Sequence, residues 1–242
     1  MTAQTLIVIP TYNERDGVTA IIDAVRASVP SAHILIVDDN SPDGTGQIAD
    51  EMAARDPQVR VKHRPGKQGL GPAYVDAFQQ ALQEGWQRIV QMDADFSHDP
   101  KDIPRLLVAL DAGAGLAIGS RYVPGGGTVN WGLRRRLVSR GGSLYARTIL
   151  AVKIRDLTGG FKAWTADTLR AVSLDDVAAK GYGFQIEMTY RALGAGVRVV
   201  EIPIQFVDRR LGQSKMSGTI FAEALTIVWR LRSRRGRRGL LE

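Results

Sequence analysis

Two aspartates, spaced two residues apart, follow an apolar run and could hold a divalent cation. Asp93 and Asp95, in the triplet Asp93-Ala94-Asp95, come directly after the strand-like run 89–92. Mg²⁺ prefers one or two carboxylates together with phosphate oxygens, so this pair could hold the ion against a diphosphate. The cation would then neutralise a leaving nucleoside diphosphate. Such a triplet is also common in solvated turns, and its position after a strand is what favours a site.

Polar residues also follow two earlier strand-like runs. Asn13-Glu14 comes after the run 6–9, and Asp38-Asp39 comes after the run 34–37. Ligands of open α/β sheets bind outside the carboxyl ends of the strands, so we expect these side chains to converge on Asp93 and Asp95. An aspartate after the second strand could bind a ribose hydroxyl or a base edge. For Asn40-Ser41, capping of the next helix is an equally good interpretation.

The elements that must position these residues alternate along the first half of the chain. The strand-like runs are 6–9, 34–37, 59–61, 89–92 and 116–118, and the helix-like stretches lie near 15–28, 44–55, 71–84 and 102–111. Apolar strands in a βαβα order predict a mostly parallel sheet that is buried on both faces. After Tyr122 we expect a helix over about 132–152, short strands around 160–164 and 197–207, and a helix near 183–194.

Length and composition are typical of one globular α/β domain. The chain has 242 residues, of which 44% are hydrophobic and 24% are charged. It has no cysteine, which excludes disulfides and thiolate sites and suits a reducing cytoplasm. The N-terminus lacks the pattern of a signal peptide, and no apolar run reaches the roughly 18 residues that span a bilayer. We therefore expect a cytoplasmic protein without a transmembrane helix.

The net charge of +7 predicts a phosphate-bearing partner. Arginines cluster at 134–136 and 140, and again over 230–238. A basic nucleic-acid-binding module is one alternative, and it predicts a basic stripe with interleaved aromatic residues. Aromatic residues make up only 7% of this chain, and the strand-end carboxylates would repel a phosphate backbone. We therefore expect no nucleic-acid partner.

Several motifs, in order, resemble a known enzyme family. IPTYNE, IVDDNSPDGT, MDADFSHDP and IGSRY are similar to those of inverting family-two glycosyltransferases. A later set closely resembles dolichol-phosphate (polyprenol-phosphate) mannose synthases; it comprises Asn130-Trp131, 135–140, 156–161, 206–209 and 212–215. The resemblance extends from Leu6 to about Trp229. It implies an α/β glycosyltransferase-A fold, which is a mostly parallel open sheet sandwiched by helices.

The resemblance also implies an activity. The expected enzyme is a polyprenyl-phosphate β-mannosyltransferase that moves mannose from GDP-mannose to a polyprenyl (dolichyl-type) phosphate with inversion. Transfer from UDP-glucose or another nucleotide sugar remains an alternative, because sugar identity depends on a few loop contacts. Processive polysaccharide synthases usually carry a Q-x-x-R-W motif and transmembrane helices, and this chain has neither.

The family's functional residues carry over position by position. The expected donor-binding residues are Pro10, Tyr12, Glu14, Val37, Asp39, Asp93, Ala94, Asp95, Arg121, Arg209 and Lys215. Of these, Asp93, Asp95 and Arg121 are expected to be catalytic. Asp95 and Ser97 match the ligands of a divalent cation, Mg²⁺ or Mn²⁺, and the weak serine ligand would leave more of the coordination to water. Arg135 and Ser139 match the pair that grips the acceptor phosphate, and their i, i+4 spacing puts them on one helix face.

An acceptor phosphate needs no general base, because its oxygens are already ionised at neutral pH. Catalysis would then depend on positioning and charge stabilisation, with Arg and Lys offsetting the repulsion between two anionic substrates. The three histidines, His33, His63 and His98, are accordingly expected to be structural or exposed.

The isoprenoid acceptor would require the protein to work at a membrane surface. In the stretch 220–231, the apolar residues 220, 221, 224, 225, 228 and 231 have helical spacing, and arginines follow. This stretch could lie in the bilayer interface, or it could pack on the domain core. We expect a catalytic domain over 1–215 and an amphipathic helix with a basic tail over 216–242, peripheral at the inner, cytoplasmic face. The resemblance adds an integral membrane anchoring protein as a further candidate partner.

Overall fold

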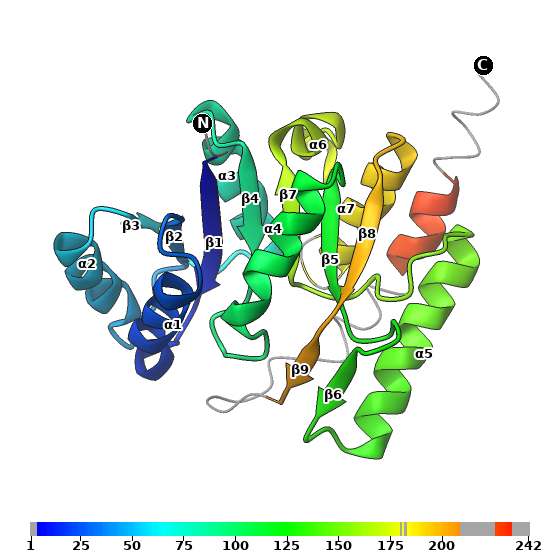
Figure 1. Ribbon diagram of the computed structural model, residues 1–242, viewed down its shortest axis with the longest axis horizontal. Coiled ribbons are helices and arrows are strands. Elements are labelled where there is room, and N and C mark those ends of the chain that lie inside the picture. Colours follow the sequence, from blue (N-terminus) through cyan, green and yellow to red (C-terminus); the bar gives the residue numbers. More distant parts are fainter. Residues whose placement is uncertain (1–3, 180, 182, 209–225, 234–242) are drawn as a thin grey trace.

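A computed structural model describes residues 4–179, 181, 183–208 and 226–233, and Figure 1 shows the arrangement of the elements. The strands are β1 (Thr5–Thr11), β2 (His33–Asp38), β3 (Val59–His63), β4 (Arg88–Gln91), β5 (Leu116–Ser120), β6 (Gly127–Val129), β7 (Lys162–Thr165), β8 (Val199–Pro203) and β9 (Gln205–Val207). The helices are α1 (Arg15–Ser28), α2 (Thr45–Arg55), α3 (Leu70–Gln83), α4 (Ile103–Asp111), α5 (Leu133–Leu150), α6 (Ala166–Ala171) and α7 (Gly183–Gly194). Two short 3₁₀ helices are η1 (Pro100–Asp102) and η2 (Leu174–Asp176), and residues 226–233 form a further helix.

Seven of the strands form one sheet in the order β3-β2-β1-β4-β7-β5-β8. The β1–β2, β1–β4, β2–β3 and β5–β8 pairs are parallel, and β7 runs antiparallel to both of its neighbours. All strands of this sheet except β7 therefore point the same way, and their carboxyl ends share one edge. The prediction of a mostly parallel open sheet is confirmed.

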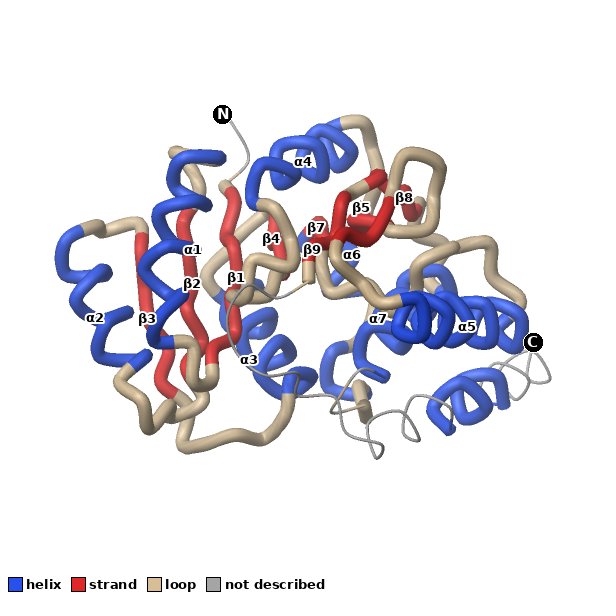
Figure 2. The backbone as a smooth tube through the Cα atoms, turned by 90° about the horizontal axis from the view of Figure 1, so that it is seen from below, coloured by secondary structure: helices blue, strands red, loops and turns tan. Residues whose placement is uncertain are grey.

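Helices cover both faces of the sheet (Figure 2). Apolar residues of α1, α2 and α4 pack on one face, and those of α3, α5, α6 and α7 pack on the other. Strands β1 and β2 feed both layers because successive side chains of a strand point to opposite faces, so that Leu6 and Val8 join one cluster while Ile7 and Ile9 join the other. The rigid double-sided core fixes where each strand ends.

A second, two-stranded sheet pairs β6 with β9 in parallel. This pairing places residues 127–129 beside residues 205–207, and the backbone N–H of Asp208 donates to the carbonyl of Val129 at 3.1 Å. The start of α5 is thereby held near the carboxyl edge of the large sheet.

The described part of the C-terminal segment packs on the domain core, which is one of the two alternatives that the sequence left open. Ile227, Val228 and Leu231 are buried in the core cluster that contains α3 and α7, so positions 228 and 231 face the protein. Trp229 is 58% exposed and donates from Nε1 to the Tyr145 hydroxyl on α5 at 2.8 Å. Residues 220, 221, 224 and 225 and most of the basic tail lie outside the described residues. The division at residue 215 stays a prediction.

The search for membrane-spanning segments gave none: no helix within the described residues combines the length and apolar character that a bilayer crossing needs.

Candidate active site

The loops that follow β1, β2, β4 and β5 bring most of the predicted site residues to one edge of the sheet. Each of the first three loops contains a residue in the left-handed backbone region: Asn13 (φ 55°), Asn40 (φ 56°) and Phe96 (φ 59°). Asparagine tolerates this region well, whereas a phenylalanine there is strained. Such strain is typical of functional sites, where the surrounding structure enforces it.

The strained Phe96 lies between the two predicted metal ligands. The backbone N–H of Ser97 donates to Asp95 Oδ1 at 3.0 Å, which keeps the carboxylate and the serine together. Asp95 is 7% exposed and Ser97 is 1% exposed. The Ser97 hydroxyl oxygen is buried and has no hydrogen-bond partner among the described residues. The Ser97 hydroxyl fits a cation ligand, because it is buried next to a carboxylate and its oxygen lone pairs can accept a positive ion.

Asp38 and Asp39 have different environments although they are adjacent. Asp38 accepts hydrogen bonds from the Thr11 hydroxyl at 3.0 Å and from both the N–H and the hydroxyl of Ser41, so its carboxylate holds the first two loops together. Asp39 forms a buried ion pair with Arg64. Burial raises the pKa of Asp39, while the Arg64 guanidinium opposes this rise. Arg64 also lines a cavity of about 580 Å³ formed by β3, α3 and η2.

The other predicted nucleoside contacts surround this edge, with one exception. Pro10 and Tyr12 are partly exposed at the end of β1, and the Lys67 ammonium lies 4.4 Å from the centre of the Tyr12 ring. Glu14 is the residue directly before α1, and its backbone carbonyl accepts from the N–H groups of Gly17 and Val18 at 3.0 and 2.9 Å. Val37, by contrast, is fully buried in the core, so its side chain packs inside the protein and does not reach the open edge. Its expected donor contact could come only from its backbone.

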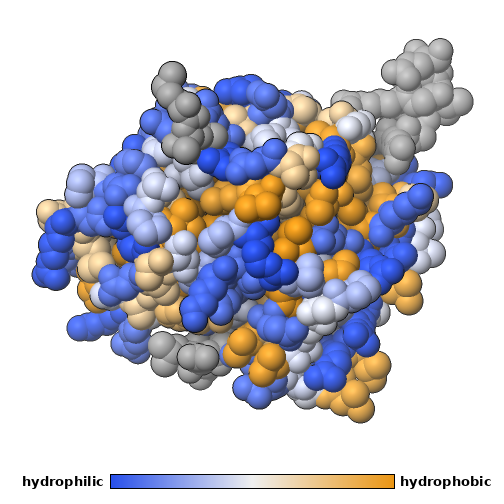
Figure 3. Space-filling view, viewed as in Figure 1, coloured by the Kyte–Doolittle hydropathy of each residue, from blue (hydrophilic) through white to orange (hydrophobic). Residues whose placement is uncertain are grey.

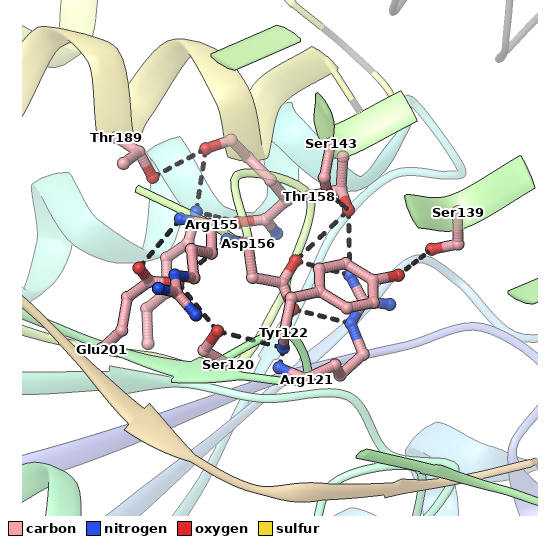
Figure 4. A network of polar contacts seen from close by, with 12 residues as sticks. Ser120, Arg121, Tyr122, Ser139, Ser143, Arg155, Asp156, Thr158, Thr189 and Glu201 are labelled. Atoms are coloured by element: carbon pink, nitrogen blue, oxygen red, sulfur yellow. Dashed lines mark hydrogen bonds and ion pairs between the residues drawn. The ribbon is translucent and has the colours of Figure 1, made fainter. Parts of the chain in front are cut away.

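Arg121, at the end of β5, is held by a buried carboxylate that the sequence analysis did not single out (Figure 4). Arg121 donates from Nε to Asp156 Oδ2 at 2.8 Å and from Nη2 to Asp156 Oδ1 at 2.7 Å. Nη2 also donates to the Thr158 hydroxyl at 2.8 Å. Burial alone would raise the pKa of Asp156, but the charge and hydrogen bonds of Arg121 outweigh it and hold that pKa below its ordinary value. The guanidinium is therefore fixed in one orientation.

Glu201 on β8 supports this pair from beneath. Its carboxylate accepts from the Ser120 hydroxyl at 2.7 Å and from the backbone N–H groups of Arg155 and Asp156 at 2.8 and 2.9 Å. The motif Asp156-Leu157-Thr158 was recognised only as a family signature. Arg121 and Asp156 are 35 positions apart in the sequence, so no local pattern could show that Asp156 is the buried partner of Arg121.

The predicted acceptor pair, Arg135 and Ser139, lies one turn apart on α5 and faces Arg121. The Tyr122 hydroxyl donates to Ser139 Oγ at 2.6 Å (Figure 4). Arg135 stacks on Trp131, with its guanidinium carbon 4.3 Å from the ring centre, and donates to Asp208 at 2.5 Å. The structure thus brings Arg135 and Ser139 to the same edge as Asp95 and Arg121. Arg209 and Lys215 lie outside the described residues.

His98 is buried, in agreement with a structural role. Its ring stacks on Phe161 with centroids 5.1 Å apart and meets the edge of Phe206 at 5.2 Å. Burial lowers the pKa of His98 to about 4, so it is neutral at pH 7. His33 and His63 lie elsewhere: His33 packs against Trp86, and the half-exposed His63 contacts Asp50.

The open, mostly parallel sheet carries carboxylates, a hydroxyl and arginines at its carboxyl edge, where open α/β sheets bind their ligands. The chain belongs to glycosyl transferase family 2, whose profile matches residues 6–171. It is 51% identical over 225 residues to the undecaprenyl-phosphate mannosyltransferase of Micrococcus luteus, covering 93% of this chain and 92% of that protein. It is 50% identical over 236 residues to the polyprenol monophosphomannose synthase of Mycolicibacterium smegmatis, covering 96% of this chain and 89% of that protein.

A solved structure supports the fold assignment. Glucosyl-3-phosphoglycerate synthase from Mycobacterium tuberculosis, crystallised with Mn²⁺, UDP and glucosyl-3-phosphoglycerate, is similar with a TM-score of 0.67 and 20% identity. The match covers 97% of this chain and 81% of that one. The predicted glycosyltransferase-A fold is confirmed.

Proposed function

We propose that this protein transfers mannose from GDP-mannose to a polyprenyl phosphate and inverts the anomeric carbon. The observation that supports this most is the arrangement of two sets of groups at one sheet edge. Asp93, Asp95 and Ser97 suit a nucleotide sugar with its cation, and Arg135 and Ser139 on α5 suit a second phosphate. Two relatives that are about half identical along most of this chain carry names of this enzyme type.

Asp95 and Ser97 would hold the divalent cation, Mg²⁺ or Mn²⁺. No group of three His, Cys, Asp or Glu side chains suited to a metal occurs within the described residues, so the remaining ligands would be diphosphate oxygens and water. When bound, the cation offsets the charge that develops on the leaving diphosphate. Asp39 and Tyr12 border the expected nucleoside position.

The protein's own residues would then align two anions. A phosphate oxygen of the acceptor attacks the anomeric carbon, the bond from that carbon to the diphosphate oxygen breaks, and the electron pair leaves with GDP. Arg135 offsets the acceptor charge, and Arg121, locked by Asp156, presents a fixed cation beside it. The attacking oxygen is already ionised, so no general base is needed, and the buried His98, with its pKa lowered to about 4, would be a weak base at neutral pH.

A surface of α5 suits attachment to an anionic membrane. Leu133, Leu137 and Leu144 are 71%, 62% and 59% exposed and fall on one helical stripe together with Arg140. Figure 3 shows apolar atoms intermixed with hydrophilic ones at the lower right, over the start of α5. Exposed apolar side chains beside arginines suit acyl chains beneath anionic headgroups. We call Leu133, Leu137, Arg140 and Leu144 the α5 stripe.

The α5 stripe explains membrane access better than the C-terminal helix does, because the described apolar residues of that helix are buried. Arg135 and Ser139 also lie on α5 but on a different face from the α5 stripe, so the stripe would hold the helix at the membrane while the pair faces the site. We propose a peripheral protein at the cytoplasmic face of the membrane, with the basic tail after residue 233 as an auxiliary attraction. An integral membrane anchoring partner is compatible with this position.

A donor-exchange assay tests the function. The purified protein is incubated with polyprenyl phosphate, Mg²⁺ and radiolabelled GDP-mannose or UDP-glucose, and label is measured in the organic phase. We expect label from GDP-mannose and little from UDP-glucose. If only UDP-glucose gives label, the donor is UDP-glucose and the proposed donor is wrong. If neither nucleotide sugar gives label in the presence of the acceptor, the proposed function is wrong.

A further inference from the structure

A buried polar cluster lies directly beneath the site, and the mechanism above does not use it. Gln91 at the end of β4, Lys162 at the start of β7 and Gln185 on α7 are 0%, 0% and 1% exposed. They come from three elements that meet under the loop that contains Gly160. Burying three polar side chains together is costly unless their hydrogen bonds are arranged for a purpose.

The hydrogen bonds of the cluster fix the orientation of both amides. The Trp164 indole N–H can only donate, and it donates to Gln91 Oε1 at 2.9 Å. Gln91 Nε2 therefore points the other way, where it donates to the Gly160 carbonyl and to Gln185 Oε1, both at 2.9 Å. Lys162 Nζ donates to the same Gln185 Oε1 at 3.0 Å. Gln185 must thus present its oxygen to Gln91 and Lys162 and its nitrogen elsewhere.

Gln185 Nε2 is consequently a buried donor with no hydrogen-bond partner among the described residues. It lies 3.6 Å from the point where a Cβ on Gly160 would be. Asp93 Oδ2 and His98 Cε1 lie 3.6 Å from that same point. The missing side chain of Gly160 therefore leaves a space bordered by a carboxylate acceptor and an amide donor.

Lys162 serves to hold Gln185. No ion pair within the described part of the chain includes Lys162, and its ammonium donates to the backbone carbonyl of Gln185 at 2.8 Å as well as to its side chain. Burial lowers the pKa of Lys162 to about 7, and Asp156 opposes that shift. A buried lysine whose bonds all go to one glutamine is a positioning residue for that glutamine.

We propose that Gln185 Nε2 donates a hydrogen bond to a hydroxyl of the sugar carried by the donor nucleotide, with Lys162 and Gln91 holding the amide in place. This rests on the proposed function only in requiring a nucleotide sugar. A hydroxyl both donates and accepts, so it matches the pair of Asp93 and Gln185. A phosphate group only accepts, and the Asp93 carboxylate would repel it. A sugar-binding site that pairs a hydrogen-bond donor with an acceptor also discriminates between sugars whose hydroxyl groups differ in configuration.

The sharpest test is the isosteric variant Gln185→Glu. Its carboxylate still accepts from Lys162 and Gln91, so the cluster stays bonded, but the donor at the Nε2 position becomes an acceptor. Binding of GDP-mannose and of GDP is measured by calorimetry with Mg²⁺ for the wild type and the variant. We expect GDP-mannose affinity to fall about tenfold or more, since a hydrogen bond is lost and two acceptors then face one hydroxyl, while GDP affinity changes less than about twofold. Thermal unfolding checks that the variant is folded.

Two further variants separate positioning from general damage to α7. Thr189→Val removes a hydroxyl that donates to the Gln185 carbonyl at 3.0 Å on the same helix (Thr189 is labelled in Figure 4), and it should leave both affinities unchanged. Lys162→Met removes the positioning group and should weaken GDP-mannose selectively over GDP; it decides the question if Gln185→Glu fails to fold. Equal weakening of both ligands, or no weakening of either, overturns the role of Gln185. If the wild type binds UDP-glucose instead, the proposed donor is wrong, and the same comparison of UDP-glucose with UDP tests Gln185.

Discussion

Arg121 and Asp156 are joined by two parallel hydrogen bonds, 2.8 Å from Nε to Oδ2 and 2.7 Å from Nη2 to Oδ1, and both side chains are buried. The backbone N–H of Arg121 donates to the same carboxylate at 2.9 Å. This pair orients a cation that the family resemblance assigns to the donor diphosphate. Asp156 therefore acts on the site through Arg121, as a positioning residue.

Removing Asp156 should destabilise the protein strongly. Asp156→Ala leaves the Arg121 charge buried without its partner, and we expect the free energy of unfolding to fall by about 3–5 kcal/mol in urea denaturation. Asp167→Ala is the matched control, because its pair with Arg170 is 94% and 55% exposed on the two sides and should contribute at most about 1 kcal/mol. If the free energy of unfolding fell by a similar amount in both variants, burial of the Arg121–Asp156 pair would not be the cause of the loss.

The same pair predicts how stability depends on pH. Arg121 holds the pKa of Asp156 below its ordinary value of 3.8, so the folded state binds this proton more weakly than the unfolded chain does. The resulting stability is fully present above about pH 4 and is lost as pH falls through the folded-state pKa. The stability gap between the wild type and Asp156→Asn should be constant at neutral pH and narrow in acid, which urea denaturation over pH 3–7 measures. A gap that does not change with pH would show that Asp156 titrates alike in both states.

Metal dependence should follow Asp95 and, more weakly, Ser97. Asp95→Asn keeps size but removes the charge that holds the cation, so Mn²⁺ binding followed by electron paramagnetic resonance with GDP present should be lost, and transfer with it. Ser97→Ala removes a weak neutral ligand and should weaken Mn²⁺ binding by about tenfold or less. Transfer that persists in excess chelator would contradict a metal requirement.

The acceptor and donor should depend on different cations. Arg135→Ala removes a charged hydrogen bond to the acceptor phosphate, which should weaken polyprenyl phosphate use by about 1.5–3 kcal/mol, or roughly ten- to a hundredfold. GDP-mannose binding should stay close to the wild-type value. A short-chain acceptor in detergent removes membrane effects, and the exposed Arg134→Ala is the control. If donor affinity fell as far as acceptor use, the division of the cations between two sites would be wrong.

Membrane binding should depend on the α5 stripe. Replacing Leu133, Leu137 and Leu144 by serine leaves the core intact and should reduce sedimentation with anionic liposomes, because the buried apolar area is lost. The control is Val108→Ser on α4, because the Val108 side chain is apolar and 64% exposed but lies outside the α5 stripe. Removing residues 234–242 should reduce only the part of binding that salt screens. Undiminished binding by the triple serine variant would exclude the stripe as the contact.

The sequence alone determined the alternation of strands and helices over residues 6–118, because apolar periodicity and the polar residues that end each strand are local properties. The short elements β6 and α6 and the break between β8 and β9 were not predicted. Short apolar runs such as 6–9 and 34–37, alternating with helix-like stretches, predict strands buried on both faces, and a parallel sheet of such strands places Asp39 and Asp95 at one edge. The motifs around Asp93 and Arg135 likewise identified the family.

Tertiary structure decided which of these side chains face the site and which partners hold them. Asp156 and Gln185 gained their roles through contacts with Arg121 and Lys162 that no local pattern encodes, since hydrogen bonds between distant segments depend on how the helices and strands pack. The same packing buried the Val37 side chain, which leaves its expected donor contact to the backbone. It also buried Ile227, Val228 and Leu231 against the core, which was one of the two interpretations that helical spacing had left open. Burial is a property of the whole fold, and periodicity shows only that one face is apolar, not what covers it.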